Sequence, residues 1–410
     1  MEVSKYNGYK LNIVTQLKPV VDDLLQHKLK IVAIVTDNEP NMGAAARTIY
    51  SLCGIVDIPC AAHTIQLIVR DMFKIPFIKQ FNDKIETMLD VYASNKGIKQ
   101  QYYTGNTKVL LRSNTTRWNS IYTSYQSILS VKSHLIDIAE RLHHTQEIQM
   151  STEEWNMLDD IISILELFKI ITDKIQKDSA TLYHVWESFR DMFTHIILPD
   201  HIKKYKTVDM VSYNWTLFAS DSISKRYTHN IANEAVKLVD VFTTSNNRIF
   251  LSSTVYDNTQ KLLESSGVSI VKRCTDTTLD DHIIRDRIRS QYNRYQQTKE
   301  PFHMTPLESQ SQSGNEYNDA LSYWIRRNGL EDSKELSVIA LAYLHINPSE
   351  ASVERAFSRQ KYVHTALRNR LHKETIDAMM FIKMNSSAME LIDDGMIDNI
   401  YSAESIYDTV

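Results

Sequence analysis

The chain has 410 residues, and its 46 Lys and Arg residues against 50 Asp and Glu residues give a formal net charge of −4. Only 9 glycines and 8 prolines occur, which excludes collagen-like and broadly disordered chains. No phosphate-binding glycine loop and no run of about 18 apolar residues is present, and 3 cysteines are too few for a disulfide framework. We therefore expect an intracellular protein of two or three domains.

Two short apolar segments near the start of the chain predict strands, each followed by a helix. Residues 31–37 (IVAIVTD) form a β-branched run that ends in Asp37, and a helix begins near Pro40. Residues 55–59 predict a second strand, and residues 60–73 a second helix. This alternation predicts α/β organisation with parallel strands.

The pattern becomes helical from about residue 76 to residue 305. Residues 153–175, for example, carry apolar side chains at three- and four-residue spacing. The polar segment 308–315 (ESQSQSGN) predicts a linker. Four amphipathic segments follow it, and each predicts a helix.

Two groups of residues near the predicted strands could carry chemistry. Asp37, at a strand tip, could bind a metal or ligand, although an acidic residue before a helix is more commonly a structural cap. Cys60 and His63 have the spacing of half a zinc site, and a buried thiol beside a histidine at a helix start is an equally good interpretation.

Three further segments have a functional and a structural interpretation. Arg117 and Trp118 could hold a phosphate and stack on a base, but a lone Trp near a helix start is more often a core anchor. The segment 285–299 is the best local candidate for phosphate contact, although a solvated helical face is the commoner case. Its arginines are Arg285, Arg287, Arg289 and Arg294. Taken alone, Glu354 and Arg355 predict a solvated ion pair.

The order of the motifs along the chain is more specific than any one of them. From the N-terminal side they read VTDNEPNM, IPCAAHTIQLIV, TTRWNSIY, YWIRRN, LSVIALAYLHINPSEASVERAFS and RNRL. From about residue 31 to 385, the chain resembles transposases of the hAT superfamily.

The resemblance implies a mainly helical protein built around a ribonuclease-H-like α/β core that is incomplete at its N-terminus and interrupted by a large all-α insertion. The implied domains are a partial ribonuclease-H-like domain at 1–75, the helical insertion at 76–307, the linker at 308–315, the hAT C-terminal dimerisation region at 316–386 and a tail at 387–410.

The resemblance also implies roles for individual residues. The family uses a DDE triad that binds two Mg²⁺ or Mn²⁺ ions and cuts DNA. Asp37 matches the second acid and Glu354 the third, and these two would be the metal ligands of an active enzyme. Cys60 and His63 match the family's CxxH motif, and Trp118, next to Arg117, matches the Trp that stacks on a flipped base.

The chain departs from the family at the first acid and at the zinc finger. The acids before Asp37 are Glu2, Asp22 and Asp23, and the last two lie in a helical pattern with no following Trp. No Cys/His cluster of the BED type occurs either. We therefore expect a catalytically inactive, transposase-derived protein with no cofactor.

Its expected function is association with a second copy or with related hAT-derived proteins, together with weak DNA binding, no membrane contact and a nuclear location. One alternative is an active DDE transposase whose first acid is missing from this chain. A second alternative is a helical scaffold unrelated to DNA.

Large apolar side chains between residues 316 and 386 are the candidates for the dimer contact. They include Trp324, Leu341, Leu344 and Phe357. Because a segment of this size can hardly bury them by itself, we expect an exposed apolar interface. The alternative is that these helices pack back on the α/β core.

Overall fold

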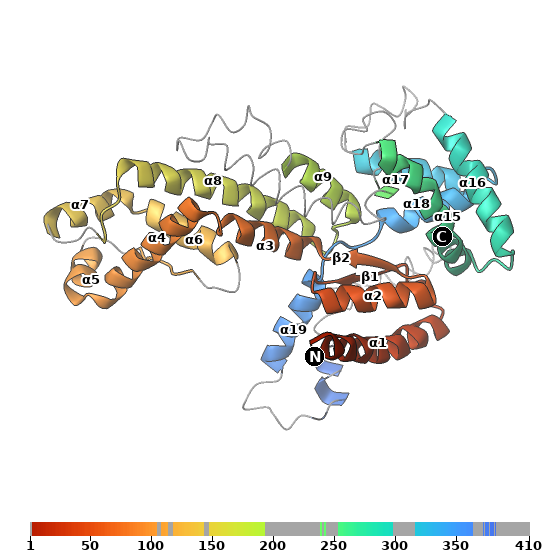
Figure 1. Ribbon diagram of the computed structural model, residues 1–410, viewed down its shortest axis with the longest axis horizontal. Helices are drawn as coiled ribbons and strands as arrows, with labels where there is room; N and C mark the ends of the chain where they lie inside the picture. The colour runs from red at the N-terminus through yellow and green to blue at the C-terminus, as the bar shows by residue number, and fades with distance from the viewer. Residues whose placement is uncertain are drawn as a thin grey trace, which may run out of the picture. The chain divides into compact units, whose positions relative to one another are not determined.

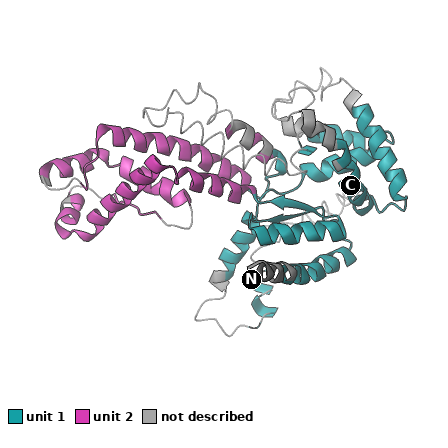
Figure 2. Cartoon of the chain, viewed as in Figure 1, with its two compact units in different colours: residues 1–60, 176–183, 233–410 teal, residues 61–175, 184–232 magenta. Residues whose placement is uncertain are grey.

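The computed structural model describes residues 2–104, 108–113, 118–142, 147–192, 238–239, 242, 253–297, 316–363, 372, 374–376, 378–380 and 382. This part of the chain is mainly helical, as expected (Figure 1). The chain forms two compact units (Figure 2): unit 1 comprises residues 1–60, 176–183 and 233–410, and unit 2 residues 61–175 and 184–232. None of the described helices is long and apolar enough to cross a membrane.

Unit 1 begins with two helices and the two strands that the sequence predicts. The elements are α1 (Glu2–Gln26), β1 (Ala33–Thr36), α2 (Pro40–Cys53) and β2 (Val56–Pro59). The strands pair in parallel, from Ala33 opposite Val56 to Thr36 opposite Pro59. The predicted strand–helix–strand order and the parallel pairing are therefore confirmed. Asp22 and Asp23 lie on α1, which agrees with their helical pattern.

Helices α1 and α2 lie side by side next to the strands (Figure 1). Val21, Ile49 and Ile55 form a buried cluster between them. Helix α2 begins at Pro40, whose fixed φ suits a first helical turn. It ends at Gly54, which has a φ of 65° and donates its N–H to the Tyr50 carbonyl at 2.7 Å.

The remaining elements of unit 1 are the C-terminal helices. They are α15 (Ser253–Thr275), α16 (Asp281–Gln297), α17 (Glu316–Asn328), α18 (Lys334–Leu344) and α19 (Ala351–Val363). Helix α18 packs against α15, α16 and α17 and is buried almost all round. Gly267 allows the close approach, because a Cβ there would lie 2.7 Å from Ile339 Cδ1 on α18. Arg273 on α15 also donates hydrogen bonds to the Ile31 and Cys53 carbonyls.

These helices confirm three of the four helical segments predicted beyond residue 316. Of the fourth, residues 374–376, 378–380 and 382 are helical, and the other residues lie outside the described part. The predicted linker 308–315 and tail 387–410 lie outside the described residues as well.

All the regular secondary structure in the described residues of unit 2 is helical, as the spacing from residue 76 predicts. Its elements are α3 (Ala61–Met72), α4 (Pro76–Ser94), α5 (Lys96–Tyr103), α6 (Trp118–Leu129), α7 (Lys132–Leu142), α8 (Thr152–Ile175) and most of α9 (Leu182–Met192). The long helix α8 packs against α3 and α6. Unit 2 starts at Ala61, whereas the sequence places the end of the α/β part at residue 75.

Candidate functional site

Asp37 lies at the carboxyl end of β1, where the sequence places it. Its side chain is half-buried, and its Oδ1 accepts the backbone N–H of Glu39 at 3.2 Å. This bond fixes the turn that leads from the strand into α2. Asp37 therefore has a local structural role, close to the capping role that we considered for it.

Glu350 is an acidic neighbour of Asp37 that the sequence analysis did not single out. Its half-buried carboxylate accepts a hydrogen bond from the Asp37 backbone N–H. Burial raises the pKa of Glu350, and the negative charges of Asp37 and Glu354 raise this pKa further. One signal was available in the sequence, because Glu350 precedes Glu354 by four residues at the start of a predicted helix.

Glu354 is exposed on the first turn of α19, and its backbone N–H donates to the Glu350 carbonyl at 3.0 Å. The next residue, Arg355, anchors this helix. Its Nη1 donates to the Gln176 carbonyl at 2.9 Å, and its Nη2 pairs with the Asp178 carboxylate. The structure thus brings Asp37 and Glu354 into the same unit and places Glu350 beside them.

The donor set does not fit a two-metal centre. Such a centre needs several carboxylates that converge on the ions, one of which bridges both. Among the described residues, no three His, Cys, Asp or Glu side chains converge in a way that could hold a metal ion. In addition, the Glu350 carboxylate is already engaged by the Asp37 amide.

Cys60 and His63 do not form part of a zinc site within the described residues, because no cluster of metal-binding side chains includes them. Cys60 is buried, and its N–H donates to the Thr36 carbonyl at 2.7 Å, which extends the strand pairing by one residue. His63 is half-buried in the first turn of α3. The arrangement agrees with a buried thiol beside a histidine at a helix start.

Trp118 is the first residue of α6 and belongs to the core of unit 2. The residue is 7% exposed, and its ring meets the Phe168 ring edge-on with centroids 6.5 Å apart. This is the core-anchor arrangement. In the conformation described, Trp118 offers no free face to a base, and its neighbour Arg117 lies outside the described residues.

Most arginines of the basic segment on α16 are engaged by carboxylates of unit 1. Arg287 Nη1 lies 2.8 Å from Glu335 Oε1, and Arg294 Nη1 lies 3.3 Å from Asp332 Oδ2. Arg289 binds Glu264 through two hydrogen bonds of 2.8 Å. Arg285 contributes charge near Glu264 and Asp281, and this charge helps to lower the pKa of both acids.

The carboxylate of Glu335 is the most buried acceptor of this group. Burial by itself raises the pKa of Glu335, but hydrogen bonds from Arg287 and Gln291 outweigh this effect and hold the pKa below its usual value. The Gln291 amide lies 2.6 Å from Glu335 Oε2, and its carbonyl accepts the Leu336 N–H at 2.9 Å. These contacts fix the start of α18 against α16.

Three of the four dimerisation candidates lie in the interior of unit 1, which corrects the expectation that they form an exposed patch. Trp324 is 1% exposed and donates its indole N–H to the Phe242 carbonyl at 3.0 Å. Leu341 and Leu344 are buried on α18, which is covered by three other helices of the same unit. Only Phe357, on α19, is exposed, at 62%.

Two family models match the chain. The ZBED1 RNase-like helical domain matches residues 58–164, and the hAT family C-terminal dimerisation region matches residues 294–386. These two matches support an hAT-family transposase-derived protein. A comparison with curated proteins gives no significant match.

The two matches fall mainly on different units of the chain. The first begins within β2 and covers α3 to α7 and the first half of α8. The second begins at the end of α16 and covers α17, α18 and α19. The family resemblance seen in the sequence is therefore confirmed, and the protein carries a dimerisation region that suggests oligomerisation.

Proposed function

We propose that this hAT-derived protein acts by self-association, through residues 294–386, with a second copy or with a related hAT-derived protein. The match of this segment to the hAT dimerisation region is the observation that carries the proposal. The exposed apolar side chains of α19 support it, because Val353 and Phe357 lie one helical turn apart on an exposed face. We place this function in the nucleus, following the family resemblance.

The chain does not cleave DNA in this proposal, although its α/β part derives from a ribonuclease-H-like core. Asp37 and Glu354 match two of the three acids of the family, and no acid of this chain matches the first. Without a bridging carboxylate, two divalent ions would be held poorly. The proposed function therefore requires no cofactor.

One observation favours the alternative of an active DDE transposase: Asp37 and Glu354 share one unit and flank Glu350. The two hypotheses are separated by incubating the full chain with DNA in Mg²⁺ or Mn²⁺. We expect no cleavage and no strand transfer. Cleavage that is lost in both Asp37→Asn and Glu354→Gln would establish the alternative.

DNA binding is weak and non-specific in this proposal. The net charge is −4, and three of the four arginines on α16 pair with acids, which leaves little free positive charge for phosphates on this helix. We expect affinity that falls steeply with salt and shows no preferred sequence. A specific footprint at physiological salt would contradict this part of the proposal.

Self-association is tested by light scattering coupled to size-exclusion chromatography on the full chain over a concentration series. We expect a dimer at about 50 μM and dissociation on dilution. Phe357→Glu, on an exposed site, should shift the equilibrium toward monomer. Ile170→Glu is the matched control, since Ile170 is an equally exposed apolar residue on α8 of unit 2. A full chain that stays monomeric throughout would refute the proposal.

A further inference from the structure

Strand β1 pairs with β2 along one of its two edges, and no strand among the described residues pairs with the other edge. The carbonyls of Val32 and Thr36 accept hydrogen bonds from the β2 segment at 2.9 and 2.7 Å. Because the main-chain groups of alternate residues in a strand point to opposite edges, those of Ala33 and Val35 point away from β2. No hydrogen bond joins their N–H or C=O groups to another described residue.

The open stretch of this edge is short, because main-chain groups beyond both of its ends are engaged. On the N-terminal side, the Ile31 carbonyl accepts a hydrogen bond from Arg273 Nη1 at 2.6 Å. On the C-terminal side, the Asp37 N–H donates to the Glu350 carboxylate. Residues 33–35 lie between these two contacts and are half-buried. Main-chain groups that are partly withdrawn from water are stabilised when an added strand supplies their hydrogen-bond partners.

The outer edge of β2 is protected against a further strand, and the outer edge of β1 is not. Asp57 and Pro59 are the β2 residues whose main-chain groups point away from β1. Proline has no N–H to donate, and a charged side chain on an edge strand discourages pairing with another chain. Residues 33–35 of β1 (AIV) include neither proline nor a charged residue. Unprotected edges of this kind are sites at which proteins accept a strand from a partner.

Helix α1 offers an apolar surface on the same part of unit 1. Val21 belongs to the buried cluster against which Ile34 of β1 packs. A second apolar stripe lies on the neighbouring flank of α1 and consists of Ile13, Val20 and Leu24. Lys18, on the opposite flank, interacts electrostatically with Cys53 of α2, so the second stripe is turned away from α2. Val20 is 56% exposed, and a strand added beside β1 would give this stripe a packing partner.

Charges of opposite sign lie before and after the open stretch. Lys30 is exposed on the N-terminal side, where Arg273 and Asp276 contribute charges of opposite sign. On the C-terminal side, Asp37 is half-buried and Glu39 is exposed. A strand that runs antiparallel to β1 therefore passes the negative end first and the positive end last. Cross-strand pairs of opposite charge stabilise such an arrangement, so the start of the added strand should be basic and its end acidic.

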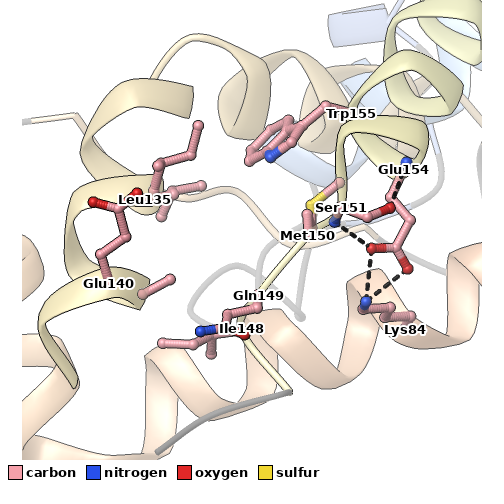
Figure 3. A pocket seen from close by; sticks show the side chains of 11 residues that line it. Lys84, Leu135, Glu140, Ile148, Gln149, Met150, Ser151, Glu154 and Trp155 are labelled. Carbon is pink, nitrogen blue, oxygen red and sulfur yellow. Dashed lines mark hydrogen bonds and ion pairs between the residues drawn. The ribbon is translucent and has the colours of Figure 1, made fainter. Parts of the chain in front are cut away.

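A cavity in unit 2, at the start of α8, gives a contrast (Figure 3). The Ser151 N–H donates to the Glu154 carboxylate at 2.7 Å, and this carboxylate also binds Lys84 Nζ at 2.6 and 2.8 Å. These charged groups are therefore engaged within the chain, whereas the main-chain groups of Ala33 and Val35 have no partner among the described residues.

We infer that the open edge of β1 accepts an extended strand of a partner protein, which pairs antiparallel with residues 33–35. The partner strand carries β-branched apolar residues between a basic residue opposite Asp37 and Glu39 and an acidic residue opposite Lys30. A second copy of β1 does not fit this edge. Two copies joined edge to edge keep their helices on the same face of the sheet, so α1 of each copy would compete for space with α2 of the other.

The test follows amide hydrogen exchange at single-residue resolution on the full chain, at about 1 μM, below the concentration at which we expect dimers. Without a partner, the amides of Ala33 and Val35 should exchange rapidly, whereas those of Ile34 and Thr36, which face β2, should exchange slowly. The probe is the synthetic peptide acetyl-KVTVTVE-amide at about 1 mM. We expect it to slow exchange at Ala33 and Val35 at least tenfold. The same peptide N-methylated at every internal residue lacks the main-chain donors and should have no effect.

A pair of variants tests the same edge from the side of the protein. Val35→Pro removes a donor that the pairing with β2 does not use, and Val35→Ala removes most of the side chain but keeps this donor. We expect Val35→Pro to bind the peptide at least tenfold more weakly than Val35→Ala. If Val35→Pro fails to fold, the comparison of the two peptides still decides the question.

Three results would overturn the proposal: slow exchange at Ala33 and Val35 in the chain alone, no change when the peptide is added, or equal effects of the peptide and its N-methylated form. Slow exchange that appears only as the protein concentration rises would assign the edge to a second copy and overturn it as well. The proposed self-association through residues 294–386 is measured separately by light scattering, so failure here leaves it unaffected.

Discussion

Replacing Trp324 should destabilise the C-terminal helices of unit 1 rather than separate two chains. Its indole is almost fully buried, donates to the Phe242 carbonyl at 3.0 Å, and meets the Phe242 ring edge-on at 5.2 Å. Truncation of a buried aromatic side chain costs about 3–5 kcal/mol. Trp324→Phe keeps most of the packing but leaves the carbonyl unpaired, which costs about 1–3 kcal/mol.

The assay is urea unfolding of the full chain, followed by circular dichroism, with light scattering below the transition. Ile325→Ala is the matched control, because Ile325 is 56% exposed on the same helix, and its replacement should change the free energy of unfolding by about 0.5 kcal/mol at most. If Trp324→Ala unfolds at the same urea midpoint as the control but no longer forms dimers, Trp324 lies at the interface. That result would refute the reasoning.

Three further predictions follow from buried contacts. Glu335→Gln should lower the free energy of unfolding by about 1–2 kcal/mol at pH 7. The pKa of Glu335 is held below its ordinary 4.5, so the stability difference between the native protein and Glu335→Gln should shrink as the pH falls below 4.5. A difference that stays constant with pH in these unfolding experiments would contradict the ion pair. Gly54→Ala should lower the free energy of unfolding in urea by about 1–3 kcal/mol, because Gly54 has a φ of 65° and a new Cβ would lie 2.6 Å from Ser269 Oγ. Gly97→Ala is the control, since a new Cβ there would lie 3.4 Å from its nearest atom, and it should not lower this free energy. Trp118→Ala should lower the free energy of unfolding by about 3–5 kcal/mol. An unchanged free energy of unfolding would contradict the core-anchor role of Trp118.

The strands and helices were predictable because their signals are local. The apolar run before Asp37 and the cap-type residues before Pro40 lie within a few positions of the elements that they specify. The contacts that join these elements were not predictable in this way. Arg355 and Asp178 are 177 residues apart, and nothing near either residue indicates the other.

The types of the site residues and their order along the chain were predictable, but the surroundings of each side chain in the fold were not. A Trp on a predicted helix can equally well be a core anchor or an exposed platform, and Trp118 and Trp324 are both buried. Arginines on α16 have the composition of a phosphate-binding face, yet three of them meet acids that lie on α15 or around the start of α18. Glu350 was missed because Asp37 and Glu350 are far apart in the sequence and meet only in the folded chain.

The proximity of Asp37 and Glu354 follows from contacts that the fold of unit 1 needs in any case. Parallel pairing of β1 with β2 places Asp37 at the end of a strand, and the Glu350 carboxylate holds its backbone amide. Arg355 then ties α19 to Gln176 and Asp178, so Glu354 is carried to the same region by its neighbours in the chain. None of these contacts involves the two acids as metal ligands, so a protein that functions by association would keep the same arrangement. The geometry of this pair is therefore compatible with both functions, and the assay with divalent ions decides between them.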